Sequence, residues 1–298
     1  TATVTVYSEL GVVRIITITQ EAWSPIAWSK SLSELGATPG RVGVGAFGNY
    51  VAFTANGAAY LADAATGENV QAVPLPDGFV AGGVHVDDAG NLMVSGPDRV
   101  VSDGTCGQLQ LYKVDPATFA PTALVDYNSA NYWCTEMGNF RVKGDVNGDA
   151  LIMAYICVGT GHYAAWEVKG GVVGEPKYGD LHDGSWDAST GVVAPAGAAL
   201  TDGFFAITYG STYNLNYFNG EAWSEIYVTG STWMENYNCI STAEVNGKKY
   251  LAMTASCHFN YDYTDIIVLD VTDLSAVKEV FKLQMNLHTT NEAGLTYS

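Results

Sequence analysis

Short apolar runs, rich in Val, Ile, Thr, Tyr and Phe, alternate along the chain with clusters of Gly, Asn and Asp. Runs of this length and composition are typical of β-strands, and the polar clusters between them are typical of tight turns. Helical periodicity is nearly absent, because apolar residues seldom recur at three- and four-residue spacing for more than two turns. The pattern therefore predicts an all-β protein.

A small turn between two apolar runs recurs along the chain, with its glycine at positions 48, 90, 148, 203, 247 and 294. Successive glycines lie 42, 58, 55, 44 and 47 residues apart, and joining the C-terminus to the N-terminus gives a sixth step of 52 residues. Asn-Gly and Asp-Gly pairs supply the positive φ that tight hairpins need. Longer segments recur as well, since Glu21-Ala-Trp-Ser24 returns as Glu221-Ala-Trp-Ser224.

A second turn follows each of these hairpins. The segments that form it are Asp63–Gly67, Asp115–Thr118, Lys169–Gly171, Asn219–Gly220 and Asp270–Asp273. Each repeat therefore contains four antiparallel strands in about 40–60 residues, and a period of that length indicates a radial array of sheets.

We predict a six-bladed β-propeller of four-stranded antiparallel blades, forming one domain over residues 1–298. A closed ring without free sheet edges requires the two termini to share a blade. Leu287–Ser298 would supply the inner strands of that blade, and Thr3–Tyr7 and Val12–Thr19 its outer strands. Seven blades and a β-sandwich are the alternatives, but a sandwich does not explain a period that closes on the full length.

The charge of the chain limits which classes of partner are expected. The formal net charge is −18, and a polyanion repels phosphate backbones and anionic lipid surfaces, so we expect no nucleic-acid partner. No stretch reaches the roughly 18 apolar residues of a membrane helix. Few Lys and Arg residues, with many Tyr, Trp, Thr and Gly, favour an extracytoplasmic protein, in the periplasm or at the cell surface. We expect no cofactor.

Five cysteines are present, and no CxxC pair occurs, so a metal site is not expected. Cys239 and Cys257 flank the Asn246-Gly247 turn almost symmetrically, which places them opposite each other in the expected hairpin and suggests a disulfide. Cys134–Cys157 and Cys106–Cys134 are weaker pairings, and buried free thiols are the alternative to all three.

The Asp115-Pro-Ala-Thr118 and Asn-Gly turns resemble those of uncharacterised secreted and cell-envelope β-propeller proteins of gut bacteria. The resemblance covers the whole chain and rests on structural motifs. It implies the propeller fold and a role at the cell envelope in handling or sensing external ligands, with a lipid anchor outside this sequence as one arrangement. It assigns no catalytic residue.

The expected ligand site follows from strand direction. In an antiparallel blade the tight turns after strands 1 and 3 lie on one face, and the longer loops after strands 2 and 4 lie on the other, where function usually resides. These loops are rich in aromatic residues, whose rings stack on the apolar faces of sugars. The candidate ligand-binding residues are Trp133, Trp233, Tyr163, Tyr213, His258 and Tyr261. We therefore expect a non-catalytic binding or adhesion propeller that recognises carbohydrate, although packing between blades also explains any single aromatic residue.

Two other functions use the same face. A polysaccharide-acting enzyme, a hydrolase or a lyase, would draw on Glu136 and Glu235 as a carboxylate pair, or on His162 and His258 for acid–base chemistry. A protein-interaction scaffold would present a flat apolar patch instead. Asp145-Val-Asn-Gly-Asp149 begins like a calcium loop, but position 6 is Ala150 and not Gly, so a hairpin turn is expected there.

Overall fold

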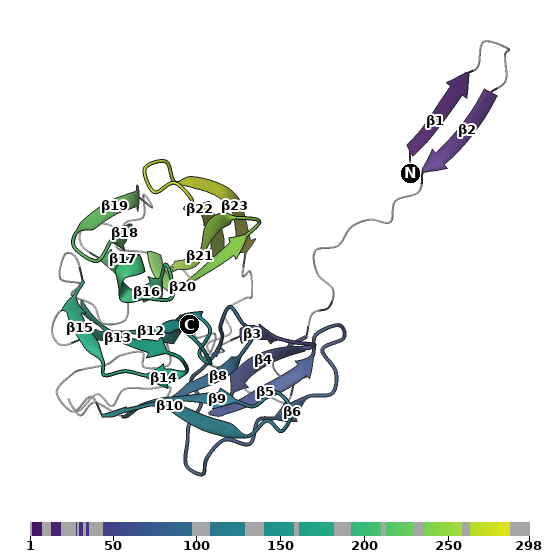
Figure 1. Cartoon of the computed structure of the whole chain (residues 1–298). Coiled ribbons are helices and arrows are strands. Elements are labelled where there is room, and N and C mark those ends of the chain that lie inside the picture. Colours follow the sequence, from purple (N-terminus) through teal and green to yellow (C-terminus); the bar gives the residue numbers. More distant parts are fainter. Residues whose placement is uncertain are drawn as a thin grey trace.

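The computed structural model describes residues 2–7, 13–18, 28, 30–31, 34–35, 44–96, 108–128, 140–157, 161–181, 192–209, 213–228, 235–257 and 263–286. Within these residues, five sheets are arranged around a common axis as the blades of a propeller (Figure 1). In every blade the first strand lies innermost and its successors follow outward by antiparallel pairing.

The first two blades take their strands strictly in chain order. Blade 1 contains β3 (Val44–Phe47), β4 (Tyr50–Ala55), β5 (Ala58–Asp63) and β6 (Gln71–Ala72). Blade 2 contains β7 (Gly83–Val86), β8 (Leu92–Gly96), β9 (Gln108–Val114) and β10 (Pro121–Asn128).

The other three blades follow the same order, except that two short strands share the outer edge of blade 3. Blade 3 contains β11 (Phe140–Gly144), β12 (Ala150–Cys157), β13 (Gly161–Lys169), and the outer strands β14 (Val172–Val173) and β15 (Lys177–Asp180), which both pair with β13. Blade 4 contains β16 (Val192–Pro195), β17 (Phe204–Tyr209), β18 (Tyr213–Phe218) and β19 (Trp223–Val228), with a short 3-10 helix, η1 (Leu200–Asp202), between β16 and β17. Blade 5 contains β20 (Glu235–Val245), β21 (Lys248–Cys257), β22 (Tyr263–Asp270) and β23 (Lys278–Asn286).

Neighbouring blades pack face to face, and this explains why the second strands of blades 3 and 4, β12 and β17, are almost continuously apolar. Successive side chains of a strand point to opposite faces. In β12, Ile152 joins the cluster between blades 2 and 3, while Leu151 and Met153 join the cluster between blades 3 and 4. Likewise, Phe204 belongs to the cluster between blades 3 and 4, and Phe205 to the cluster between blades 4 and 5. A strand covered on both faces has no exposed position for a polar residue.

The predicted turns after the third strand are confirmed, and two of them share one hydrogen-bond pattern. The Asp63 carboxylate accepts from the amides of Ala65 and Thr66 and from the Thr66 hydroxyl, at 2.9–3.0 Å. Asp115 accepts from the corresponding three groups at 2.8–2.9 Å. Asp therefore occupies this position because its side chain satisfies the turn's backbone amides.

The prediction of six blades is wrong, and so are the alternatives of seven blades and a sandwich: the structure shows a propeller of five blades over its described residues. The first five turn glycines do mark the five inner hairpins. The sixth step counted the N-terminal segment as part of a blade. Among the described residues, however, β1 (Ala2–Tyr7) and β2 (Val13–Ile18) pair with each other and with no blade strand. This hairpin lies apart from the ring (Figure 1), and Leu287–Ser298 lies outside the described residues.

Candidate functional site

Strand direction gives the ring two rims with different connections. We call the rim that carries the turns after the first and third strands the turn rim; examples are the turns at 145–149 and 246–247. The opposite rim, which carries the connections after the second and fourth strands, is the loop rim. Its described connections are the Asn56-Gly57 turn and residues 73–82. The strand order places the turns after the first and third strands on one rim as predicted, but the tight Asn56-Gly57 turn lies on the other rim.

Most of the predicted ligand residues belong to loop-rim connections outside the described residues. These are Trp133, Trp233, His258 and Tyr261, and the catalytic candidate Glu136 lies outside the described residues as well. Tyr213 and Glu235 begin β18 and β20 at the loop rim, and their side chains are likewise not described. The strand order directs all of these segments to the same rim, and their function stays a prediction.

Tyr163 lies in β13 and packs inside the ring. Its side chain is buried between blades 3 and 4, with its ring centroid 4.7 Å from that of Phe204. Burial raises the pKa of its phenol above the ordinary value of 10.0, and the nearby Asp180 carboxylate adds to this rise. A buried ring in this cluster contributes to packing between the blades.

His162 is held by a carboxylate at the loop-rim end of blade 3. Its Nδ1 lies 2.6 Å from Asp180 Oδ1, across the β13–β15 pair whose register places the two residues opposite each other. The His162 side chain is only 20% exposed, whereas that of Asp180 is 85% exposed. This contact fixes the orientation of the imidazole ring.

The two cysteines of the predicted disulfide lie on the strands expected to carry them. The β20–β21 register pairs Cys239 with Thr254 and Cys257 with Glu235, with an irregularity between Tyr237 and Cys239, so the two cysteines do not lie directly opposite each other as expected. The side chains of both cysteines lie outside the described part of the chain, so the disulfide stays a prediction.

Sequence reasoning missed a polar cluster that joins blades 2 and 3 at the turn rim, which we call the Asp87 lock. Asp87 is 6% exposed, and its carboxylate accepts from the amides of Ala89, Asn91 and Val146 and from the Asn91 side chain, at 2.8–3.0 Å. The Asn91 amide group also donates to Asp145 at 3.0 Å. Both oxygens of the carboxylate accept hydrogen bonds from groups of the protein, so we assign the cluster a structural role. The hydrogen bonds of this cluster that cross between the blades join residues more than 50 positions apart, and no local sequence pattern reveals such contacts.

An ion pair strengthens the same boundary. Lys143 Nζ donates to Asp88 Oδ1 at 2.8 Å, and the Gly144 amide donates to Asp88 Oδ2 at 2.9 Å. Deeper in the ring, Arg141 Nε donates to the Ile240 carbonyl at 2.6 Å. This bond ties β11 of blade 3 directly to β20 of blade 5.

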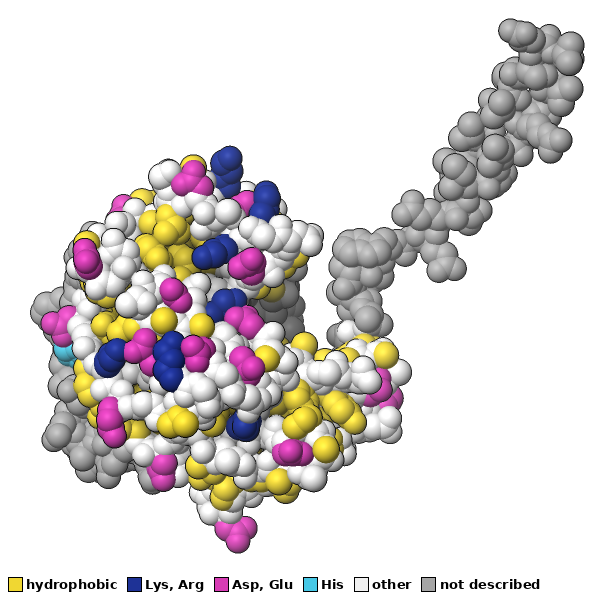
Figure 2. Space-filling view, viewed as in Figure 1, with side chains coloured by type: hydrophobic (Ala, Val, Ile, Leu, Met, Phe, Trp, Pro, Cys, Tyr) yellow, Lys and Arg dark blue, Asp and Glu magenta, His cyan; other side chains and the backbone are white. Residues whose placement is uncertain are grey.

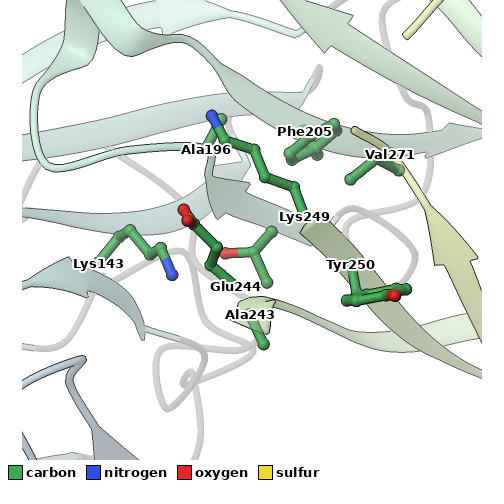
Figure 3. Close-up of a pocket in the computed structure, with 9 residues that line it drawn as sticks. Lys143, Ala196, Phe205, Ala243, Glu244, Lys249, Tyr250 and Val271 are labelled. Atoms are coloured by element: carbon green, nitrogen blue, oxygen red, sulfur yellow. The ribbon is translucent and has the colours of Figure 1, made fainter. Parts of the chain in front are cut away.

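A small hollow lies where β11, β16 and β20 end at the turn rim (Figure 3). We call it the turn-rim hollow. Its residues combine apolar, aromatic and charged side chains: Lys143, Ala196, Phe205, Thr242, Ala243, Glu244, Lys249, Tyr250 and Val271. Figure 2 shows acidic and basic side chains interspersed over the viewed face, with no broad area of one sign.

The described residues contain neither a metal-binding cluster nor a membrane-spanning helix. No group of three or more His, Cys, Asp or Glu side chains in this part of the chain is placed to hold a metal ion. No helix in the same residues is long and apolar enough to cross a membrane.

Comparison with known proteins gives a family and a set of structural similarities. Residues 32–293 match the family described as "Domain of unknown function (DUF8500)". No curated protein matches the chain. Among solved structures the chain is similar to BBS1N in complex with ARL6DN, at 13% identity and a TM-score of 0.45, over 77% of this chain and 64% of that one. The chain thus spans less than two thirds of the length of that protein.

Two further structures give similar values. The putative TolB from Agrobacterium tumefaciens matches at 10% identity and a TM-score of 0.44, over 81% of this chain and 80% of that one. A triple arginine-to-alanine mutant of AofleA from Arthrobotrys oligospora matches at 12% identity and a TM-score of 0.48, over 92% of this chain and 79% of that one. Similarities at this level carry no argument about function.

Proposed function

The chain belongs to the DUF8500 family, and we propose that it is a non-catalytic, extracytoplasmic binding or adhesion propeller that recognises carbohydrate at its loop rim. The observation that carries the proposal is the strand order of blades 3, 4 and 5. It directs the connections that contain Trp133, Trp233 and His258–Tyr261, and the first residue of β18, Tyr213, to one rim of a rigid ring.

The chemistry of these residues supports a sugar ligand. Aromatic rings offer flat apolar faces to the C–H groups of a pyranose, and neighbouring Asn, Asp and hydroxyl groups can bind its hydroxyls. The net charge of −18 disfavours anionic polymers, so neutral glycans suit this surface better than acidic ones do. A rigid scaffold also lowers the entropic cost of presenting several rings together.

The proposal is tested with a glycan array, followed by calorimetry on the best ligand. We expect Trp133→Ala and Trp233→Ala to weaken binding about tenfold each, because each removes a stacking surface worth about 1 kcal/mol or more. Phe281→Ala is the matched control, since Phe281 is 49% exposed on the outermost strand of blade 5 and away from the loop rim.

Two results would overturn the proposal. One is the absence of binding to any glycan on the array. The other is a pair of tryptophan variants that bind as tightly as the unmodified protein. A protein ligand captured through the same tryptophans would replace the sugar with a protein-interaction function.

A polysaccharide-acting enzyme is the second candidate, and the contact between His162 and Asp180 favours it. A carboxylate that orients an imidazole is a common arrangement for a general base. Polysaccharide cleavage that is lost in His162→Gln, or in the double variant Glu136→Gln and Glu235→Gln, would support this function. Cleavage that persists in all of these variants would exclude these residues as its catalysts.

A further inference from the structure

We propose that Asn246 is a site of spontaneous covalent modification, at which the folded protein forms isoaspartate without the help of an enzyme. Asn246 and Gly247 make the tight turn between β20 and β21, at the turn rim of blade 5. Asparagine is among the chemically labile residues of proteins, and a following glycine leaves the next backbone nitrogen unshielded. The turn lies on the rim opposite the proposed carbohydrate site, so the two proposals are independent.

The reaction needs only these two residues and water. The Gly247 nitrogen attacks Cγ of Asn246, the bond from Cγ to Nδ2 breaks, and ammonia leaves with the proton of the Gly247 amide. Water then opens the cyclic succinimide at one of its two carbonyls. Opening at the Cγ carbonyl gives aspartate, whereas opening at the main-chain carbonyl gives isoaspartate, in which the backbone continues through Cγ.

The sequence contains four Asn-Gly pairs, and the structure gives them different surroundings. They lie at positions 56–57, 147–148, 219–220 and 246–247. Asn219 Oδ1 accepts from the amides of Glu221 and Ala222 at 2.9 and 2.8 Å, so this side chain is held in its own turn. A Cβ added at Gly57 would lie 3.1 Å from Val80, so that turn is packed against its neighbour.

The turn at 147–148 offers the closest comparison, because it has the same Val-Asn-Gly sequence and also follows the first strand of a blade. Asn147 Nδ2 donates to Asn91 Oδ1 at 2.8 Å, and Asn147 Oδ1 accepts from Lys113 Nζ at 2.5 Å. The Gly148 amide donates to the Asp145 carbonyl at 2.9 Å. Cyclisation at Asn147 must therefore break several hydrogen bonds before Cγ and the next nitrogen can meet.

The turn at 246–247 has none of these restraints. The Asn246 side chain is exposed, and it makes no hydrogen bond to any group that the structure describes. No atom lies within 4 Å of a Cβ added at Gly247, and the preceding Val245 is 53% exposed. The turn can rearrange toward the cyclic intermediate without losing a contact to another blade.

Modification would change the turn rim locally. Aspartate or isoaspartate replaces a neutral amide with a carboxylate, and isoaspartate also adds one carbon to the backbone of the turn. The strand pair nearest to the change is Val245–Lys248, at the end of the β20–β21 ladder. The core residues of blade 5, such as Leu251 and Leu269, lie farther along their strands, so we expect the ring to stay folded.

The test uses the full chain, incubated in mildly alkaline buffer. Isoaspartate is labelled with an isoaspartate-specific methyltransferase and a labelled methyl donor, and the label is located by peptide mapping. We expect the peptide with Asn246 to gain label at least about tenfold faster than the peptide with Asn147, because only the second site must break hydrogen bonds. The same incubation in concentrated urea should bring the two rates close together, since the two sites share their local sequence.

Two variants sharpen the comparison. Asn246→Gln keeps a side-chain amide but lengthens the side chain, and it should remove the label from that peptide. Lys113→Met removes one partner of Asn147 and should speed labelling at Asn147 several-fold, with no change at Asn246.

Equal labelling of the two sites in the folded protein would overturn the proposal. So would a folded protein in which Asn246 stays unlabelled while both sites become labelled in urea. Loss of glycan binding in the tryptophan variants bears only on the loop rim.

Discussion

The two rims of the ring use their polar and aromatic residues differently. On the turn rim, the carboxylates of Asp63, Asp87 and Asp115 each accept three or more hydrogen bonds from nearby amides and hydroxyls. The loop rim receives the connections with the tryptophans of the proposed site, Trp133 and Trp233, which no turn requirement explains. An acidic residue on the turn rim is therefore often part of the scaffold, whereas the two loop-rim tryptophans are the residues on which the proposed function depends.

The largest expected effect concerns the Asp87 lock. Asp87→Ala leaves three backbone amides and the Asn91 side chain without their acceptor at the boundary of blades 2 and 3. We expect the free energy of unfolding to fall by about 3–5 kcal/mol, as when one partner of a buried charged network is removed. Urea denaturation followed by tryptophan fluorescence measures the change.

Asp77→Ala is the control for that variant, because Asp77 is an exposed carboxylate and the substitution makes the same change in charge. We expect it to alter stability by less than about 0.5 kcal/mol. If the two alanine variants were equally stable, the turn-rim carboxylates would have no special structural role.

A smaller effect is expected from backbone geometry at the turn rim. Gly144 has φ +99°, and a Cβ added there would lie 2.4 Å from the Asp149 carbonyl oxygen. Gly247 has φ +73° with no atom within 4 Å of the added Cβ. Gly247→Ala should cost about 1 kcal/mol for positive φ alone, and Gly144→Ala at least about 2 kcal/mol because the steric clash adds to it. Thermal melts that rank the two variants in the reverse order would contradict this description of the rim.

The smallest expected effect is a pH dependence at Glu167, which joins blade 3 to blade 4. A hydrogen bond from Lys177 lowers the pKa of Glu167 below the ordinary value of 4.5, and a hydrogen bond from the Leu200 amide adds to this. A lowered pKa in the folded state means that the charged carboxylate stabilises the fold above pH 4.5, and that this contribution is lost as the pH falls below it.

Glu167→Gln should therefore be less stable than the unmodified protein at pH 7, by less than about 1 kcal/mol because the Lys177 side chain is well exposed. The difference should shrink as the pH is lowered below 4.5. A difference that stays constant between pH 7 and pH 3 in urea titrations would show that the charge of Glu167 is not responsible.

Local features of the fold were predictable from the sequence, because their cause is local. The two Asp-x-x-Thr turns and the Asn246-Gly247 hairpin turn depend on contacts within a few residues of the chain. The structure has all three turns where the sequence predicts them. The four-strand repeat follows from the spacing of such turns.

Nonlocal features were not predictable in the same way. The number of blades depends on which strands the N-terminal segment pairs with, and Ala2–Tyr7 pairs with Val13–Ile18 and not with a blade. The Asp87 lock and the contact between Arg141 and Ile240 join residues more than 50 positions apart, and a single sequence carries no signal for either. The turn-rim hollow was missed for this reason too, since Lys143 and Lys249 belong to different blades.

The most direct test of the division between the two rims is one calorimetric comparison with the best glycan from the array. This glycan is titrated into the double variant Trp133→Ala/Trp233→Ala and, separately, into Lys249→Gln. The account predicts that the tryptophan double variant loses detectable glycan binding, while Lys249→Gln binds the glycan as the unmodified protein does. Glycan binding that survives in the tryptophan variant, or that is lost in Lys249→Gln, would contradict it.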